Sequence, residues 1–317
     1  MTARFVAPGV ALSSLLGLLS ACGSDPSEAD GAGASSAGGS GSGGATECPD
    51  EGSSATAAVC VTDVTGVLVD EQDEPLADLI VSVCGEVSCS PGESDPSGAF
   101  EVVVNRFITP DEFAVLPHGR EQDLAPFYFP LPAAATGPAV DVGQLPVLSM
   151  PADGPTLVVR TDQAGAPAQT VTSAGVTLEV AEGVEVQLAF DDVALGAAGK
   201  QFRAREVPPA ARDRYVDSAL GVEALWALYP FESSFRPEGS PADLAQARLS
   251  FPNTLGLQAG DAVEVLALGS FSFPDWIAPA RFSTVATATV TADRQRIEMD
   301  SGEGIPHLTW IAIRAAR

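Results

Sequence analysis

The chain has 317 residues and carries 42 acidic against 16 basic side chains, a formal net charge of −26. Nucleic-acid-binding proteins present a basic face to phosphate groups, so this charge balance excludes nucleic acid as a partner. Glycine and proline are abundant, with 31 and 25 residues, while Lys200 is the single lysine. This composition is unlike that of a coiled coil and favours short strands and turns, which predicts an all-β fold.

The first residues have the pattern of an export signal. One positive charge, Arg4, precedes an apolar stretch over residues 5–19. This stretch is shorter than the roughly 20 residues that a membrane-spanning helix needs, and it has the character of a secretory h-region. We therefore expect the protein to be exported.

A lipid-attachment motif follows this stretch directly. Residues 19–22 read Leu-Ser-Ala-Cys, which resembles the lipobox of bacterial lipoproteins. The resemblance implies that residues 1–21 are a cleaved signal peptide and that Cys22 becomes an N-terminus acylated with chains such as palmitate. An ordinary signal peptide with a chance cysteine, or an uncleaved anchor, are the alternatives. Two or more acyl chains hold a protein stably on a membrane, because each buried CH₂ contributes about 0.8 kcal/mol.

The residues after the lipobox bear on sorting and display. Gly23 follows the cysteine directly, and the lack of an aspartate there resembles lipoproteins sorted to the outer membrane, at its periplasmic face or the cell surface. Residues 22–46 comprise the lipidated cysteine and a Gly/Ser/Ala-rich linker, which we expect to be a disordered tether. No lysine or arginine lies between Arg4 and Arg106, so we expect anionic head groups to repel this acidic tether.

Strand and turn patterns define a first module over residues 47–152. Residues 62–70, 79–84 and 99–104 have the pattern of strands separated by turns. Its further motifs are Gly66–Val67, Asp70–Glu74, Pro75–Leu76, Val81–Val83 and Asp95–Phe100. In these residues the module resembles carboxypeptidase regulatory-like domains, which implies a transthyretin-like β-sandwich. The resemblance implies no activity, since such domains are usually accessory modules, although some related sandwiches bind carbohydrate.

A second module is predicted over residues 153–317. Alternating apolar and polar residues, typical of strands buried on one face, occur at 176–180, 184–188, 262–266 and 284–291. One short helical candidate covers residues 209–215. Further motifs are Phe251–Asn253, Gly256–Gly260, Val263–Val265, Val290–Asp293 and Gly302–Ile305. In these residues the module resembles ZU5-like and wall-associated repeat proteins, which implies a second, extracytoplasmic β-sandwich.

Four cysteines remain after Cys22, namely Cys48, Cys60, Cys84 and Cys89. In an exported chain an even number of cysteines implies disulfides, and four cysteines allow three pairings. We favour Cys48–Cys60 with Cys84–Cys89, because a strand that ends at Cys84 lets the chain double back to Cys89. The alternative is a four-thiolate zinc site, although only one pair approaches the spacing of a zinc knuckle.

Few residues point to catalysis or to cofactors. The two histidines, His118 and His307, lie far apart in the chain, and no Gly-x-Ser-x-Gly motif accompanies them. The acidic runs 70–74 and 93–95 offer oxygen ligands for Ca²⁺ but lack EF-hand spacing, so solvated turns are the favoured interpretation. Phosphate-loop and dinucleotide motifs are missing from the sequence. We therefore expect no catalytic, cofactor or metal site, and a hydrolase is the least favoured class.

An aromatic run between two predicted strands is the candidate for ligand contact. Phe271, Phe273 and Trp276 are expected in a loop, where exposed rings stack on a sugar or anchor a partner protein. The favoured alternative is that Trp276 plugs the end of the sandwich. Trp226 and Trp310 lie in apolar, strand-like runs and are predicted to belong to the core.

These patterns favour a non-enzymatic, lipid-anchored protein of the cell envelope. Its expected role is interaction, adhesion or structural display on a membrane surface. Lipid at Cys22 is expected to bind the protein to that membrane. The alternative is a carbohydrate- or peptidoglycan-binding lipoprotein. The expected partner is accordingly an envelope glycan or another envelope protein, and an exposed aromatic platform around Trp276 would favour the glycan.

Overall fold

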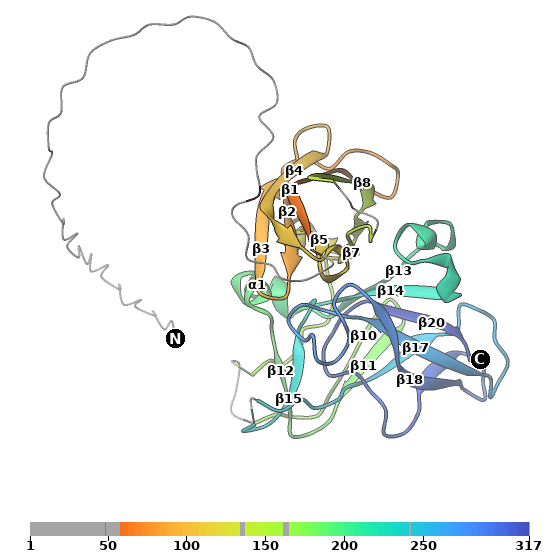
Figure 1. The fold of residues 1–317 in the computed structure, drawn as a ribbon. Helices are drawn as coiled ribbons and strands as arrows, with labels where there is room; N and C mark the ends of the chain where they lie inside the picture. Colours follow the sequence, from red (N-terminus) through yellow and green to blue (C-terminus); the bar gives the residue numbers. More distant parts are fainter. Residues whose placement is uncertain (1–47, 49–57, 134–136, 161–164, 241, 317) are drawn as a thin grey trace, which may run out of the picture. The chain divides into compact units, whose positions relative to one another are not determined.

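The structure, a computed structural model, describes Cys48 and residues 58–133, 137–160, 165–240 and 242–316. These residues form an all-β fold, which confirms the predicted fold class (Figure 1). Within these ranges no helix is long and apolar enough to cross a membrane. The predicted lipidation site Cys22 and the linker at 22–46 lie outside the described residues.

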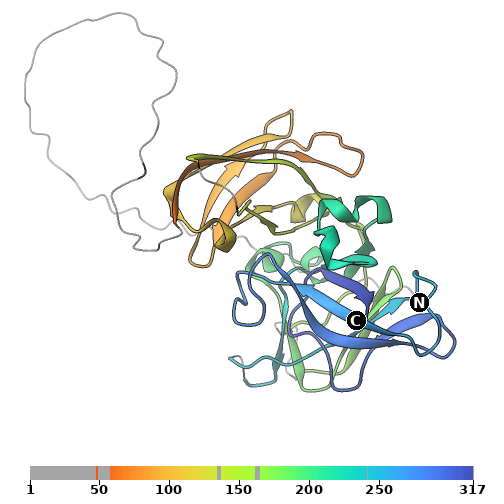
Figure 2. The same ribbon diagram turned by 45° about the vertical axis from the view of Figure 1, so that its right-hand side comes forward.

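Three strands form the first sheet. Strand β1 (Val59–Val69) pairs antiparallel with β4 (Ala99–Ile108) and parallel with β8 (Ala139–Pro146). Figure 2 shows these strands side by side, in orange to olive. Strand β1 alternates along much of its length, and Val64 and Leu68 are completely buried. One face of this sheet therefore supplies part of the core.

A second sheet contributes to the same core. Its strands, in order across the sheet, are β3 (Ser88–Glu93), β2 (Ile80–Gly85), β5 (Ala114–Pro117) and β7 (Phe129–Pro130). Val81, Val83 and Val115 join the apolar cluster that contains Val64 and Leu68. Two short paired strands, β6 (Leu124–Ala125) and β9 (Leu148–Ser149), complete this part of the fold.

Two disulfides staple the first sheets. They are Cys48–Cys60 and Cys84–Cys89, the pairing favoured from the sequence. Cys84 and Cys89 lie opposite each other in the register of β2 and β3, so their bond crosses the hairpin. The other bond ties Cys48 to β1 over a sequence separation of 12. Short loops restrain the unfolded chain less than long ones, so both bonds act locally.

The largest sheet has nine strands, and every pairing in it is antiparallel. In order across the sheet they are β10 (Gln169–Ser173), β11 (Val176–Val180), β16 (Arg248–Pro252), β19 (Arg296–Met299), β18 (Phe282–Val290), β17 (Ala262–Leu268), β20 (Ile311–Ala315), β14 (Ala224–Tyr229) and β13 (Arg203–Glu206). A separate antiparallel pair consists of β12 (Val184–Gln187) and β15 (Ser234–Pro237), and the short helix α1 (Phe190–Ala194) follows β12.

Strand β14 is apolar at every position because both of its faces are buried. Leu225 and Tyr229 belong to the cluster that contains the first two sheets, whereas Trp226 and Leu228 belong to a second cluster formed within the later half of the chain. Trp226 and Trp310 are 2% and 1% exposed, which confirms that both are core residues. The nine-stranded sheet thus covers its own core on one face and packs against the first sheets on the other.

Specific contacts join the two halves of the described chain. The indole N–H of Trp310 donates to the carbonyl of Pro126 at 2.7 Å, and the ring of Phe127 packs edge-on against Trp310 at 4.8 Å between centroids. Residues 45–317 form a single compact unit. The boundary between residues 152 and 153 stays a prediction about the sequence, and residues on both sides of it share one apolar cluster.

Several elements differ from those expected. The short helical candidate at 209–215 is confirmed and is a 3₁₀ helix, whereas α1 has no counterpart among the sequence predictions. Strand β3 has the sequence SCSPGE. It contains no large apolar side chain and forms by pairing with β2, so the apolar pattern of the sequence does not predict it. The 3₁₀ helices are η1 (Pro110–Glu112), η2 (Arg120–Gln122), η3 (Ala198–Lys200), η4 (Pro209–Arg214) and η5 (Ser218–Leu220).

Candidate functional site

The predicted aromatic loop connects β17 to β18, and all three of its rings are partly buried. Phe273 stacks on the ring of His307 at 4.3 Å between centroids, and Trp276 packs edge-on against the same ring at 4.4 Å. Phe271 packs edge-on against Tyr128 at 5.1 Å. The rings therefore cover buried side chains, and this loop does not form a flat exposed platform.

Both histidines have the surroundings of structural residues. His307 is completely buried, and neither of its ring nitrogens has a hydrogen-bond partner. Burial lowers the pKa of His307 to about 3, so its ring is neutral near pH 7 and packs as an aromatic core residue. His118 places Nε2 2.9 Å from the hydroxyl of Ser82, and burial lowers its pKa as well.

A groove of about 380 Å³ opens beside the aromatic loop. Helix α1, strand β15 and the loop itself contribute to its walls. The polar and aromatic side chains that could contact a ligand in it are those of Gln187, Phe190, Asp191, Glu232, Arg236 and Phe273. The lining is mostly polar, and convergent amide, carboxylate and guanidinium groups of this kind fix the orientation of a bound small ligand. We take this groove as the candidate functional site.

In helix α1, two side chains that lie two positions apart differ strongly in exposure. Phe190 is 87% exposed, whereas Asp192 is completely buried. The carboxylate of Asp192 lies 3.3 Å from Nη1 of Arg120, and that of Asp191, which is half exposed, lies 3.5 Å from the same atom. Burial raises the pKa of Asp192 to about 6, and the attraction of Arg120 opposes this rise. The buried ion pair therefore fixes α1, and α1 in turn holds the Phe190 ring at the mouth of the groove.

Glu232 is the most constrained residue of the groove. Its backbone has φ of 64°, a left-handed conformation that is uncommon for a residue with a side chain. Its Oε1 accepts hydrogen bonds from the hydroxyls of Tyr128, at 2.7 Å, and of Ser270. Burial, and then the charge of Glu232, raise the pKa of Tyr128 well above its usual value, so that Tyr128 remains a donor. The carboxylate is thus held in a single position.

Arg236 is held along the wall formed by β15. Its Nε donates to the hydroxyl of Ser234 and its Nη1 to the carbonyl of Asp243, both at 3.2 Å. The centre of its guanidinium lies 5.9 Å from the centroid of the Phe273 ring. A guanidinium held in this way offers its remaining N–H groups in a fixed plane. The groove therefore has an immobilised donor as well as an immobilised acceptor.

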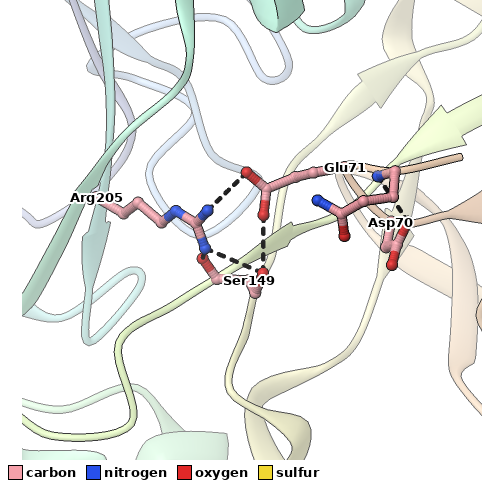
Figure 3. A network of polar contacts seen from close by, with 5 residues as sticks. Asp70, Glu71, Ser149 and Arg205 are labelled. Atoms are coloured by element: carbon pink, nitrogen blue, oxygen red, sulfur yellow. Dashed lines mark hydrogen bonds and ion pairs between the residues drawn. The ribbon is translucent and has the colours of Figure 1, made fainter.

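The acidic run at 70–74 forms a turn and an ion pair. The carboxylate of Asp70 accepts the backbone N–H groups of Gln72 and Glu74 at 2.8 and 2.9 Å, which closes the turn. Figure 3 shows the side chains of Glu71, Arg205 and Ser149 in mutual contact. Glu71 accepts hydrogen bonds from Arg205 at 2.7 Å and from the Ser149 hydroxyl at 2.8 Å. These contacts agree with the favoured interpretation of the run as a turn.

The second acidic run has a similar local role. Asp95 accepts hydrogen bonds from the hydroxyl and the backbone N–H of Ser97 and from the N–H of Ala99. These bonds, the Ser97 hydroxyl first, lower the pKa of Asp95. In the part of the chain that the structure describes, no group of three His, Cys, Asp or Glu side chains is placed to hold a metal ion.

Comparisons with known proteins give little guidance. No protein-family model and no curated protein matches the sequence of this chain. Among solved structures, the chain is similar to a proposed carbohydrate binding protein from Bacteroides uniformis, with 10% sequence identity. The match covers 81% of this chain and 100% of that chain at a TM-score of 0.19. Because this TM-score is low, the likeness carries no argument about fold or function.

Sequence reasoning finds only one member of the groove, Phe273. Phe190 follows β12, whereas Arg236 lies in β15 and Glu232 just before it, so their proximity depends on the pairing of β12 with β15. Two signals are visible in hindsight. Phe190 is an isolated aromatic residue beside two aspartates. Glu232 lies shortly after Tyr229, the last residue of the fully buried strand β14.

Proposed function

We propose that this chain is a non-enzymatic, lipid-anchored protein of the bacterial envelope that binds a glycan in the groove between α1 and β15. The anchor is supported by the resemblance of residues 19–22 to a lipobox. The first part of the chain, with its motifs between Gly66 and Phe100, is proposed to be a carboxypeptidase regulatory-like module. The later part is proposed to be a ZU5-like module, and the linker displays both.

The observation that carries the glycan proposal is an exposed aromatic ring beside fixed polar groups. Phe190 is 87% exposed at the mouth of a groove that also contains Glu232 and Arg236. A sugar ring has an apolar face that stacks on an aromatic side chain. Its hydroxyls are donors and acceptors, and hydrogen bonds to charged partners are the stronger ones. Since Tyr128 and Ser270 already hold Glu232, binding requires little reorganisation of this carboxylate.

Phe190→Ala is expected to weaken binding of the retained glycan about tenfold, which corresponds to about 1.4 kcal/mol, through loss of the stacking surface. The full-length protein in detergent is first applied to an array of envelope glycans and peptidoglycan fragments, and affinities are then measured calorimetrically. Phe107→Ala is the control, since Phe107 is 39% exposed on β4 and does not line the groove. Equal affinities of Phe190→Ala and wild type would refute the role of this ring, and retention of no glycan would refute the proposed function.

Cys22→Ser is expected to move nearly all of the protein from the membrane fraction to the soluble fraction, because the acylated thiol is the only proposed anchor. Fractionation followed by immunoblotting measures the change. Ser24→Ala, just beyond the lipobox, serves as the control and should remain in the membrane fraction. A Cys22→Ser protein that stays with the membrane would show that another segment anchors the chain.

A further inference from the structure

A second depression adjoins the groove at Gln187. This depression has a volume of about 270 Å³ and is lined by Val159, Arg160, Val186, Gln187, Leu188 and Val193. Gln187 and Leu188 line both hollows. The two hollows therefore adjoin, and Gln187, which is exposed, stands at their junction.

The backbone places the two hollows on opposite edges of β12. On one edge β12 pairs with β15, whose Ser234 and Arg236 line the groove. On the other edge the N–H of Arg160 donates to the carbonyl of Val186 at 2.9 Å, and these residues line the second depression. A ligand that crosses the end of β12 therefore contacts both hollows.

An exposed apolar strip on α1 runs along the same path. Phe190 and Val193 are 87% and 54% exposed, and residues three positions apart share a face of a helix. Phe190 lines the groove and Val193 lines the second depression. One exposed apolar side chain of α1 thus belongs to each hollow.

We propose that the site takes a linear oligosaccharide, with one or more sugar units in the groove and the next unit in the second depression. This inference rests on the proposed function, because it extends the same site. In the groove, Phe190 supplies a stacking ring and Glu232 an acceptor for hydroxyls. In the second depression, Val193 contacts the apolar face of the sugar. Gln187 offers its amide to the hydroxyls at the junction, since an amide has both donors and acceptors. A monosaccharide occupies only one hollow and forgoes the contacts of the other.

The test is the dependence of affinity on chain length. The full-length protein is titrated calorimetrically with the monosaccharide, disaccharide, trisaccharide and tetrasaccharide of a linear glycan that the array retains. The trisaccharide is expected to bind at least about tenfold more tightly than the monosaccharide. Val193→Lys is expected to abolish this gain, so that the trisaccharide binds no more tightly than the monosaccharide. Val103→Lys, at a valine that is 60% exposed on β4, is the matched control.

The outcomes separate the two proposals. Equal affinities for all chain lengths, or an unchanged gain in Val193→Lys, would overturn the extended site and leave the groove as a glycan site. Retention of no glycan would overturn the proposed function, and the extended site with it. If circular dichroism shows that Val193→Lys does not fold, Val193→Ser provides the same comparison, with the gain in affinity expected to fall.

Discussion

Arg120→Leu is expected to destabilise the protein by about 3–5 kcal/mol at pH 7.5, because it leaves a buried carboxylate without its cation. Asp192 is completely buried and lies 3.3 Å from a guanidinium nitrogen of Arg120. The other titratable groups that act on Asp192 are Tyr229, Asp191 and Glu232. None of these three carries a positive charge, so none of them replaces Arg120.

The effect has a predictable dependence on pH. Burial raises the folded-state pKa of Asp192 to about 6, above its ordinary value of 3.8. The contribution of Asp192 to stability is therefore greatest below about pH 4, falls as pH rises to about 6, and is level above that. Arg120 lowers this pKa, so its removal raises the pKa and extends the fall above pH 6. The stability gap between wild type and Arg120→Leu should widen between pH 6 and 8, by up to about 1.4 kcal/mol per pH unit.

Urea unfolding followed by tryptophan fluorescence measures this gap. Arg160→Leu is the control, since it breaks a surface pair with Glu185 at 3.3 Å in which Arg160 is 45% exposed. Such a pair contributes at most about 1 kcal/mol. Adding Asp192→Leu to Arg120→Leu should restore much of the lost stability, because both buried charges are then gone. A gap of equal size at pH 6 and pH 8 would contradict an ionised Asp192.

His307→Phe is expected to make the protein more resistant to acid. The pKa of His307 is lowered from 6.5 to about 3 by burial, so the unfolded chain binds a proton that the folded protein excludes. The stability associated with neutral His307 is therefore full above pH 6.5 and is lost as pH falls toward 3. At pH 5 the loss amounts to about 2 kcal/mol. The phenylalanine variant does not have this loss, and it keeps the stack on Phe273.

The same substitution has a second consequence near neutral pH. Neither ring nitrogen of His307 has a hydrogen-bond partner, and an unsatisfied buried polar group costs about 1–3 kcal/mol. His307→Phe should therefore be at least as stable as wild type at pH 7.5, and its advantage should be larger at pH 5. His307→Gln is the companion variant, because glutamine does not titrate but keeps a buried polar group. It should lose the pH dependence and be less stable than His307→Phe at every pH, and a wild-type pH dependence in either variant would point to another group.

The parts of the fold that can be predicted are those that short-range patterns encode. Strand β11 at Val176–Val180 alternates in sequence and in burial, and Cys84 and Cys89 are close enough in the chain to pair across a hairpin. Strand β3 escapes prediction because it owes its existence to pairing with β2 and has no apolar pattern of its own. Strand β14, buried on both faces, has no alternation of apolar and polar residues that would mark it as a strand with one buried face.

The candidate site is harder to predict, because distant segments assemble it. Asp192 and Arg120 are neighbours only after the two halves of the chain have met, and nothing near either residue in the sequence indicates an ion pair. The constraint on Glu232 comes from Tyr128 and Ser270, which lie far before and after it. By contrast, the position of Phe273 in a loop follows from the strand patterns on either side. What the strand patterns do not indicate is that its ring would lie on His307.

The double burial of β14 also bears on how such a protein evolves. Leu225 and Tyr229 pack in one core, and Trp226 and Leu228 pack in the other. Substitutions on this strand therefore have to be compatible with the packing of two sets of neighbours. A segment cut near residue 152 would carry an uncovered apolar surface on each piece. The two proposed modules are therefore expected to fold as one cooperative unit, and substitutions in β14 are expected to affect both cores.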